Sequence, residues 1–563
     1  MASLKRKRLN SASDRRTANT TGPVHAEGSS RVQVGNSFTE VHNHEGRQAN
    51  DECLRDLRTT DPRIDKTRIE NDKGGLVQGS CNWVLEDSNF QQWRQGTNDR
   101  LLWVKGDPGK GKTMLLCGLI DELKKSQPSL SYFFCQATDS RINNATSVLR
   151  GLIYLLVVQD TSLTRHVRNK WDHGGKSTFD SPNGWHTLCN IFEDILHDHS
   201  KPTCLVIDAL DECEGDSLSS LLNLIVSTAS KFHHIKWLVS SRNLHDIERG
   251  LGGANVGGKL DISLEANASL VSKAVANYID YKIDNLAKLS SELDLRKDVK
   301  ETMQQKANGT FLWAALTLDQ LNAEEDEELQ DNSEMLDILN QVPEGLTNLY
   351  DRMWRQVSAQ GSKNSRSCKV ILATMFLAYR PLQLQELPML AGFRGNLANH
   401  DTLVKLVRRC GSFLTIQQDA DTVHFVHQSA KDFLTDNKNA FDGIFPSGMG
   451  GGHHQLFSRS VEAMATGLRQ NIYGLRNPGV LTSEIEVPVP DPLAAMRYAC
   501  VRWLDHFYEW VSSKRDRDQN DANDVVTFLQ DKYLYWLEAL GLCGNVIEGI
   551  ASIRKLEALA VST

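Results

Sequence analysis

The stretch from residue 101 to residue 124 constrains the fold of this chain more than any other. An apolar run, LLWV at 101–104, leads into GDPGKGKT at 106–113, and MLLCGLIDELK then follows with its leucines at helical spacing. This is the strand–GxxxxGK[ST]–helix order of a phosphate-binding loop, the P-loop. The alternative is a glycine-rich turn before an ordinary helix. The strand before the glycines and the helix after them favour a site for a nucleoside phosphate.

The chemistry of phosphate binding explains the spacing of this motif. Glycines let the backbone approach the phosphates, and N–H groups at a helix N-terminus supply donors and positive potential. We expect Lys112 to reach the β- and γ-phosphates and the Thr113 hydroxyl to ligate Mg²⁺. The residues predicted to bind the nucleotide here are Gly106, Asp107, Pro108, Gly109, Lys110, Gly111, Lys112 and Thr113.

A second motif supplies carboxylates. The apolar run CLVID ends in Asp208, and Asp211 and Glu212 follow within four residues. A carboxylate at the carboxyl end of a parallel strand near the P-loop is placed to bind Mg²⁺ or its bound water. Asp211 and Glu212 are predicted to orient an attacking water. The alternative for this pair is that acids are simply favoured at a helix N-terminus.

Arg242 ends the next strand-like run, KWLVSSR. In a parallel sheet this position lies over the same crevice as the P-loop. Arg242 is therefore predicted to contact the γ-phosphate and to stabilise charge as its bond breaks. A surface ion pair at the end of the sheet is the alternative.

The order of the elements predicts an α/β fold. Short apolar runs alternate with helical patterns, which predicts a parallel sheet covered on both faces. The predicted strands are 101–105, 130–135, 203–208, 235–240 and 259–264.

The rest of the chain is predicted to be mostly helical, with apolar-periodic segments at 268–285, 298–325 and 333–358. Two strand-like runs, FLTIQQ and TVHFVH, follow helical patterns and suggest a winged-helix-like module, whereas GMGGGHH and VPVPDP predict a mobile loop and a stiff linker. We divide the chain into an N-terminal segment 1–50, a helical lead-in 51–100, a P-loop NTPase core 101–265, a helical domain 266–365, a winged-helix-like domain 366–440, a loop and linker 441–492, and a C-terminal helical block 493–563.

Composition excludes several classes of protein. The net charge of −8 argues against binding of nucleic acid over much of the surface. The eleven cysteines form no CxxC pair, so neither a zinc site nor a disulfide framework is indicated. No apolar run approaches the ~20 residues of a membrane span, and the N-terminus lacks the apolar core of a signal peptide. We expect a cytoplasmic protein.

The first 50 residues are polar and predicted to be disordered. KRKR at 5–8 predicts either nuclear import or a solvated basic tail. RVQVGNSFTEV at 31–41 suits a short hairpin, an incidental extended segment, or a cross-β assembly centred on Val32, Val34, Gly35 and Asn36. In the last case the N-terminus would have a homotypic partner.

These motifs together resemble a known family. GDPGKGKTMLL, LVIDALDEC and WLVSSR are similar to the NACHT domain of STAND-class signalling NTPases. LRTTDPRIDKTRIENDKGG, GTFLWA, VPEGLTNLYDRM, RPLQLQEL and FVHQSAKDFL resemble fungal NOD-like receptors related to heterokaryon-incompatibility proteins. The resemblance runs from about Leu54 to Leu559 and implies helical and winged-helix-like domains packed over a nucleotide. Such proteins usually continue into a repeat array that senses a ligand, so the stimulus stays open.

The resemblance also gives His427 a role. In FVHQSAKDFL, His427 matches the winged-helix histidine that contacts the β-phosphate of ADP in this family and locks the closed state. From the residues alone, His427 is a core histidine at a strand end.

The sequence thus predicts a nucleotide-dependent signalling switch of innate immunity or heterokaryon incompatibility. Its cofactors would be ATP or ADP, with GTP the open alternative, and Mg²⁺. ADP would hold the domains closed, and exchange for ATP would open them to form a homo-oligomer, with slow hydrolysis at most. The alternatives are a small-molecule kinase, a scaffold with a structural nucleotide, and an origin-recognition-like ATPase that binds DNA through Lys405, Arg408 and Arg409.

Overall fold

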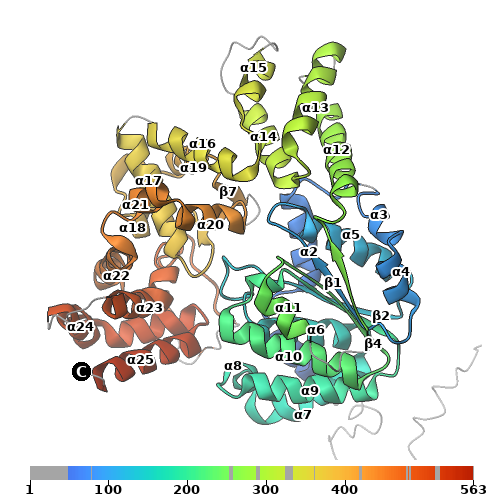
Figure 1. Ribbon diagram of the computed structural model, residues 1–563. Helices are drawn as coiled ribbons and strands as arrows, with labels where there is room; N and C mark the ends of the chain where they lie inside the picture. The colour runs from blue at the N-terminus through green and yellow to red at the C-terminus, as the bar shows by residue number, and fades with distance from the viewer. Residues whose placement is uncertain are drawn as a thin grey trace, which may run out of the picture.

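The computed structural model describes residues 48–561 apart from 78, 253–257, 287–288, 290–291, 324–333, 360–361, 418–420, 477–479, 481–483 and 514–519. The KRKR and RVQVGNSFTEV motifs lie outside the described residues. Figure 1 shows the sheet-containing core, drawn from blue to green, with the yellow and orange middle of the chain beside it and the red C-terminal helices next to that middle part.

Five parallel strands form the core sheet, in the order β2-β3-β4-β1-β5 (Figure 1). Every residue of β2 and β3 is buried, because helices cover both faces of the sheet, and this accounts for their mostly apolar sequences, SLSYFF and TCLVID. The predicted α/β core is confirmed, and its strands are β1 (Leu101–Lys105), β2 (Ser129–Phe134), β3 (Thr203–Asp208), β4 (Ile235–Ser241) and β5 (Lys259–Ser263).

The helices of the core follow from right-handed crossovers between these strands. Helix α5 (Lys112–Lys124) packs on one face, where it meets α2 (Pro62–Asp72) of the lead-in. Helices α6 (Ala145–Gln159) and α10 (Gly215–Lys231) pack on the other. Because β4 lies between β1 and β3, Arg242 follows the strand next to the P-loop strand.

The segment before the core is helical, and aspartates cap two of its helices, α2 and α4 (Ser88–Gln95). Besides a helix over 48–57, it contains α2, α3 (Asn82–Leu85) and α4. The Asp61 carboxylate accepts from the Arg63 N–H (3.0 Å) at the start of α2, where Pro62 is the first helical residue. Lys66 then joins α2 to the core through an ion pair with Asp121 of α5 (2.8 Å).

The helical domain consists of shorter helices than the apolar periodicity suggests. The segment 298–325 divides into α13 (Leu293–Ala307) and α14 (Phe311–Ala323), and 333–358 divides into α15 (Glu334–Gln341) and α16 (Leu346–Ala359). Asn308 and Gly309 have positive φ and end α13, while Gly345 has positive φ before α16. Helix α12 (Ala268–Asp284) precedes them.

Residues 366–440 fold around a small antiparallel sheet, and we call them the hairpin domain. The sheet has the order β6-β8-β7 and pairs the two predicted strand-like runs. Its strands are β6 (Leu382–Gln383), β7 (Leu414–Gln417) and β8 (Thr422–Phe425), and its helices are α17 (Ser362–Leu377), α18 (Leu387–Ala391), α19 (His400–Arg408) and α20 (Gln428–Asp436).

The predicted loop over 441–492 is wrong in its first half. Residues Lys438–Ile444 form α21, and Gly448–Gly467 form α22, which includes the GMGGGHH run. The glycines allow close packing rather than breaking the helix. A Cβ on Gly452 would lie 2.7 Å from Leu377, and one on Gly450 would lie against Ser513. Phe457 of α22 stacks on Trp503, so α22 belongs to the C-terminal block with α23 (Arg497–Ser513), α24 (Asn520–Leu542) and α25 (Val546–Val561).

Candidate nucleotide-binding site

The P-loop turns between β1 and α5 on two glycines. Gly109 and Gly111 have φ of 77° and 86°, in the left-handed region that glycine adopts without strain. A Cβ on Gly111 would lie 2.7 Å from the Phe311 ring, and one on Gly109 would lie 3.0 Å from Leu312. Glycine is therefore needed here for the turn and for the close approach of α14.

The backbone N–H groups of the first residues of the predicted phosphate loop donate hydrogen bonds to other parts of the protein. The Gly106 N–H donates to the Ser241 carbonyl (3.2 Å), and the Asp107 N–H donates to the Glu265 carboxylate (2.7 Å). Pro108 has no N–H group. The backbone donors left for a phosphate are therefore those of Gly109, Gly111 and the first turn of α5, where N–H groups have no acceptor within the helix.

The Lys112 side chain packs back against the phosphate loop that precedes it. Its ammonium donates to the carbonyls of Gly106 (2.6 Å) and Asp107 (3.0 Å). Burial lowers the pKa of Lys112, and the carboxylates of Asp211 and Asp208 oppose this shift. The ammonium thus lies in the phosphate loop, within electrostatic reach of the acids at and after the end of β3.

The Lys110 side chain does not point along the phosphate loop. Its ammonium donates to the carbonyls of Asn308 (3.1 Å) and Gly309 (3.0 Å), at the end of α13. The Leu312 N–H donates to the Gly109 carbonyl (3.2 Å). The sequence assigned Lys110 to the nucleotide, whereas its side chain fastens the P-loop to the helical domain.

Asp208 and Thr113, the two residues predicted to bind Mg²⁺, lie close together. Asp208 is 2% exposed, and its carboxylate accepts from the Ser240 hydroxyl (2.5 Å). Burial raises the pKa of Asp208, and interactions with the hydroxyls of Ser240 and Thr113 oppose that rise. An oxygen-only set of one carboxylate and one hydroxyl suits Mg²⁺, which binds few protein oxygens and keeps several waters.

Arg242 contacts acids of two domains. Its backbone N–H donates to one Asp211 oxygen (2.9 Å), and its Nε lies 3.0 Å from the other. Its terminal nitrogen lies 2.7 Å from Asp432 on α20 of the hairpin domain. Burial acts to lower the pKa of Arg242, but Asp432 and Asp211 raise it above the usual value. The predicted γ-phosphate sensor is therefore also a link between domains.

Of the two acids predicted to orient water, Glu212 has fewer hydrogen-bond partners. One of its oxygens accepts from the Ala137 N–H (2.9 Å). Burial raises its pKa to about 7, and Asp211 and Asp208 add to that shift. Both oxygens of Asp211 are bound by Arg242, so Glu212 has the freer carboxylate.

His427 ends the segment after β8 and caps α20. Its Nδ1 accepts from the Ser429 N–H (3.1 Å). Burial, followed by the charges of Lys73, Lys112 and Arg242, holds the pKa of His427 well below its usual value, so the ring is neutral. Because a backbone N–H can only donate, Nδ1 carries no proton, and Nε2–H is the remaining donor.

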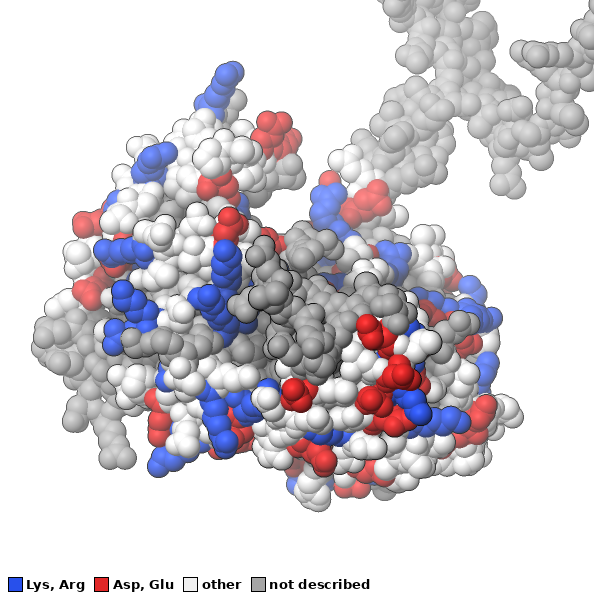
Figure 2. Space-filling view, turned by 90° about the horizontal axis from the view of Figure 1, so that it is seen from above, with Lys and Arg blue, Asp and Glu red and all other residues white. Residues whose placement is uncertain are grey.

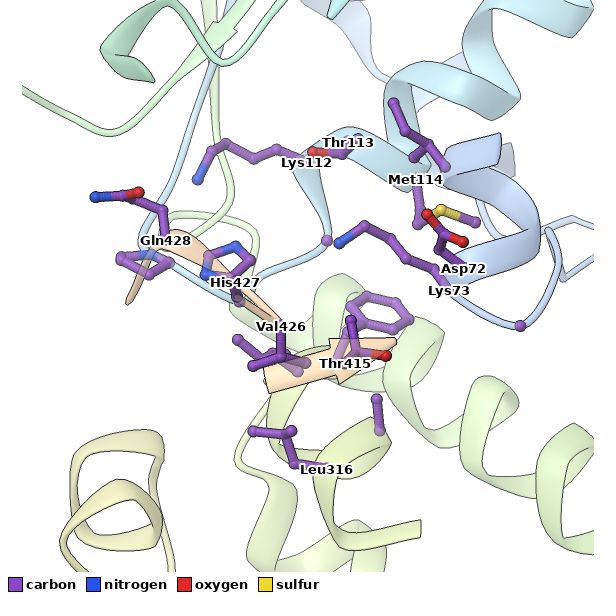
Figure 3. Close-up of a pocket in the computed structure, with 18 of the residues that line it drawn as sticks. Asp72, Lys73, Lys112, Thr113, Met114, Leu316, Thr415, Val426, His427 and Gln428 are labelled. Carbon is purple, nitrogen blue, oxygen red and sulfur yellow. The ribbon is translucent and has the colours of Figure 1, made fainter. Parts of the chain in front are cut away.

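These residues surround one cavity of about 1890 Å³. Its lining comes from five parts of the chain, at 68–83, 108–115, 134–142, 264–319 and 405–428, together with residues at the ends of β3 and β4. Figure 3 shows Lys112 and His427 around the same part of the cavity, with Lys73 extending toward the P-loop from the lead-in. The cavity exceeds a typical small-molecule pocket and accommodates a nucleoside triphosphate.

Sequence reasoning missed two residues of this site. Asp432 lies five residues after His427 in FVHQSAKDFL, and Lys73 precedes the two glycines of DKGG. The signal for Lys73 was the predicted glycine turn beside it. For Asp432 the motif gave no indication of a partner, because Arg242 is distant in sequence.

The fold and the site define a P-loop NTPase. The family model described as Nephrocystin 3, N-terminal matches residues 79–242. The chain is also 48% identical over 527 residues to the vegetative incompatibility protein HET-E-1 of Podospora anserina, which covers 90% of this chain. The chain is thus related to the NACHT-domain heterokaryon-incompatibility proteins, as its motifs predict. It spans 38% of the length of that relative.

Solved structures resemble the chain only loosely. The Walker-type ATPase of Pyrococcus abyssi is 9% identical, covers 64% of this chain and 96% of its own, and has a TM-score of 0.30. The Aeropyrum pernix ORC1 protein in complex with DNA is 10% identical, covers 64% and 92%, and has a TM-score of 0.29. Likeness of this degree does not bear on function. In the part of the chain that the structure describes, no helix has the length and apolar character needed to cross a membrane.

Proposed function

We propose that this protein is a nucleotide-dependent signalling switch of the NACHT type. The observation that carries the proposal is the position of Arg242, which pairs with Asp211 of the core and with Asp432 of the hairpin domain. The residue that the sequence predicts to contact the γ-phosphate would thereby also link the two domains. A ligand that binds one arrangement better than the other shifts their populations.

A nucleoside diphosphate would favour the arrangement described above. The Nε2–H of His427 would donate to the β-phosphate, as the family resemblance implies, while Arg242 stays paired with Asp432. A γ-phosphate would compete with Asp432 for the guanidinium, because both are anions and Arg242 has one side facing the cavity. Loss of that pair would free the hairpin domain and permit the activated homo-oligomer.

Hydrolysis, where it occurs, would be slow. Thr113 and Asp208 would hold Mg²⁺, which neutralises charge on the β- and γ-phosphates when it is bound. Glu212 would orient the attacking water, since Asp211 is occupied by Arg242. Slow turnover suits a switch, because each state must outlast the signal it carries.

The cellular role follows from the relative rather than from the site. By relation to a vegetative incompatibility protein, we propose a part in fungal innate immunity or heterokaryon-incompatibility cell death. A cytoplasmic location, nuclear import through KRKR, and an N-terminal homotypic partner complete this proposal. The base stays open between adenine and guanine.

The hairpin domain does not support the DNA-binding alternative. Lys405, Arg408 and Arg409 of the α19 region line the nucleotide cavity. On the face shown in Figure 2, basic and acidic side chains are interspersed over the described residues. We therefore place these cations near the nucleotide rather than on a duplex.

The proposed function is tested by the nucleotide that the protein carries. The purified chain is denatured, and the released nucleotide is identified by chromatography, beside Lys112→Ala. We expect stoichiometric diphosphate in the wild type and none in Lys112→Ala, because its phosphate cation is lost. An empty wild-type protein that turns over added triphosphate rapidly would identify an enzyme instead, and a bound nucleotide that never exchanges would identify a scaffold.

A further inference from the structure

The lead-in places one lysine in the nucleotide cavity. Lys73 follows the last turn of α2, and Gly74 and Gly75 after it have φ of 77° and 89°. The Gly74 carbonyl accepts from the Lys282 ammonium of α12 (2.6 Å). The glycine turn is thus fixed to the helical domain, and α2 is fixed to the core by the Lys66–Asp121 pair. The backbone at Lys73 is therefore fixed to the core on one side and to the helical domain on the other.

The Lys73 ammonium has no anionic partner within the described part of the chain. Its neighbour Asp72 is engaged elsewhere, because its carboxylate accepts from the Gln417 amide (2.7 Å) and lies 3.7 Å from Arg68. By contrast, the nearby Lys66 contacts two carboxylates. Lys73 lines the cavity, and Figure 3 shows its side chain extending toward the P-loop.

Lys73 adds to a concentration of positive charge. After burial, the charge of Lys73 contributes most to lowering the pKa of His427, ahead of the charges of Lys112 and Arg242. Lysines from two different segments thus act on one histidine. Arg242 is already paired with Asp211 and Asp432, and Asp211 and Asp208 act on Lys112. Among the described residues, Lys73 is thus the one cation of these three that has no carboxylate partner, so an anionic ligand is its natural partner.

We propose that Lys73 binds the phosphate chain of the nucleotide, next to His427, as a second lysine supplied from outside the P-loop. The inference rests on the proposed nucleotide function. The ligand class is a nucleoside di- or triphosphate. By this contact the lead-in closes over the nucleotide, so the segment before the core is a part of the binding site and not only a support for α5.

The test compares Lys73→Met with Lys170→Met, an exposed lysine of α7 (Thr164–Gly174) that does not line the cavity. ADP and ATP binding to the nucleotide-stripped full chain is measured by calorimetry. We expect Lys73→Met to weaken both by about tenfold to a hundredfold, as for loss of a charged hydrogen bond. Lys73→Arg should recover most of the affinity, and Lys170→Met should not change it.

The outcomes separate this inference from the function on which it rests. The melting temperature of nucleotide-free Lys73→Met should equal that of the wild type, because the side chain is exposed. A lowered melting temperature together with weaker binding that Lys73→Arg does not restore would indicate a structural role and overturn the inference. Wild-type affinity in Lys73→Met would overturn the inference alone. A wild-type protein that binds neither nucleotide would overturn both.

Discussion

At the scale of single residues, Arg242 links the predicted nucleotide site to the hairpin domain. It is 26% exposed at its side chain and Asp432 is 31% exposed, so their pair is partly screened by solvent. Such a pair contributes up to about 1 kcal/mol. A contribution of this size can be overcome by a competing phosphate, which a switch requires.

We expect Asp432→Asn to accelerate release of bound diphosphate by about fivefold, because the pair that closes the hairpin domain is lost. Release of a fluorescent diphosphate measures this rate. The control is Asp436→Asn, an exposed acid at the end of the same helix. Equal release rates in the two variants would contradict the linking role of Arg242.

Glu212 is the residue for which pH dependence is expected. Its pKa is raised to about 7, and it can accept a proton from water only when deprotonated. Slow triphosphate hydrolysis should therefore rise as pH increases from 6 to 8 and level off above that.

In Glu212→Gln we expect hydrolysis to fall by about a hundredfold or more, while triphosphate binding remains. Single-turnover release of phosphate measures it. The comparison variant is Asp211→Asn, which disturbs the Arg242 contacts instead. A larger loss in Asp211→Asn, with Glu212→Gln unaffected, would reverse the two roles.

At the scale of elements, α22 shows that a glycine-rich sequence can form a helix when close packing stabilises it. Gly450 and Gly452 have no side chain where α22 meets Ser513, Leu377 and Phe445. The entropy lost by fixing glycine in a helix, about 0.5–1 kcal/mol for each, is offset by this close approach.

This packing gives a matched pair of substitutions. Gly452→Ala should lower the free energy of unfolding by about 1–2 kcal/mol, because its Cβ would lie 2.7 Å from Leu377. Gly541→Ala in α24 meets open space and should raise it by about 0.5–1 kcal/mol. Denaturant unfolding monitored by circular dichroism measures both, and equal effects would refute the packing explanation.

At the scale of the whole molecule, buried polar side chains join the C-terminal block to the hairpin domain. Nδ1 of His453 lies 2.8 Å from Nδ1 of His506, whose Nε2 lies 2.8 Å from the Tyr498 hydroxyl. That hydroxyl accepts from the Tyr379 N–H (3.1 Å) after α17. Burial lowers the pKa of His453 to about 4.

The sign of the resulting pH dependence follows from linkage. The folded-state pKa of His453 lies below its unfolded value, so the unfolded chain binds more protons as pH falls from about 6.5 toward 4. Stability is therefore full above pH 6.5, and at pH 5 we expect a loss of about 2 kcal/mol from this group. Urea unfolding at pH 7.5 and pH 5 should show this loss in the wild type and less of it in His453→Gln. An unchanged difference in that variant, as in the control His245→Gln, would exclude His453 as its source.

Local sequence determined the strands, the P-loop and the acids after β3, because hydrophobic periodicity, glycine conformation and capping act over a few residues. These features were predicted close to where they occur. Only the tertiary structure decided that β4 separates β1 from β3, that Lys110 binds the end of α13, and that Arg242 pairs with Asp432. It also placed Lys73 in the cavity and made α22 a helix. Each of these depends on contacts between segments far apart in the chain. The free energy of such contacts can exceed the local conformational preference of a segment, and no periodic pattern in the sequence indicates them.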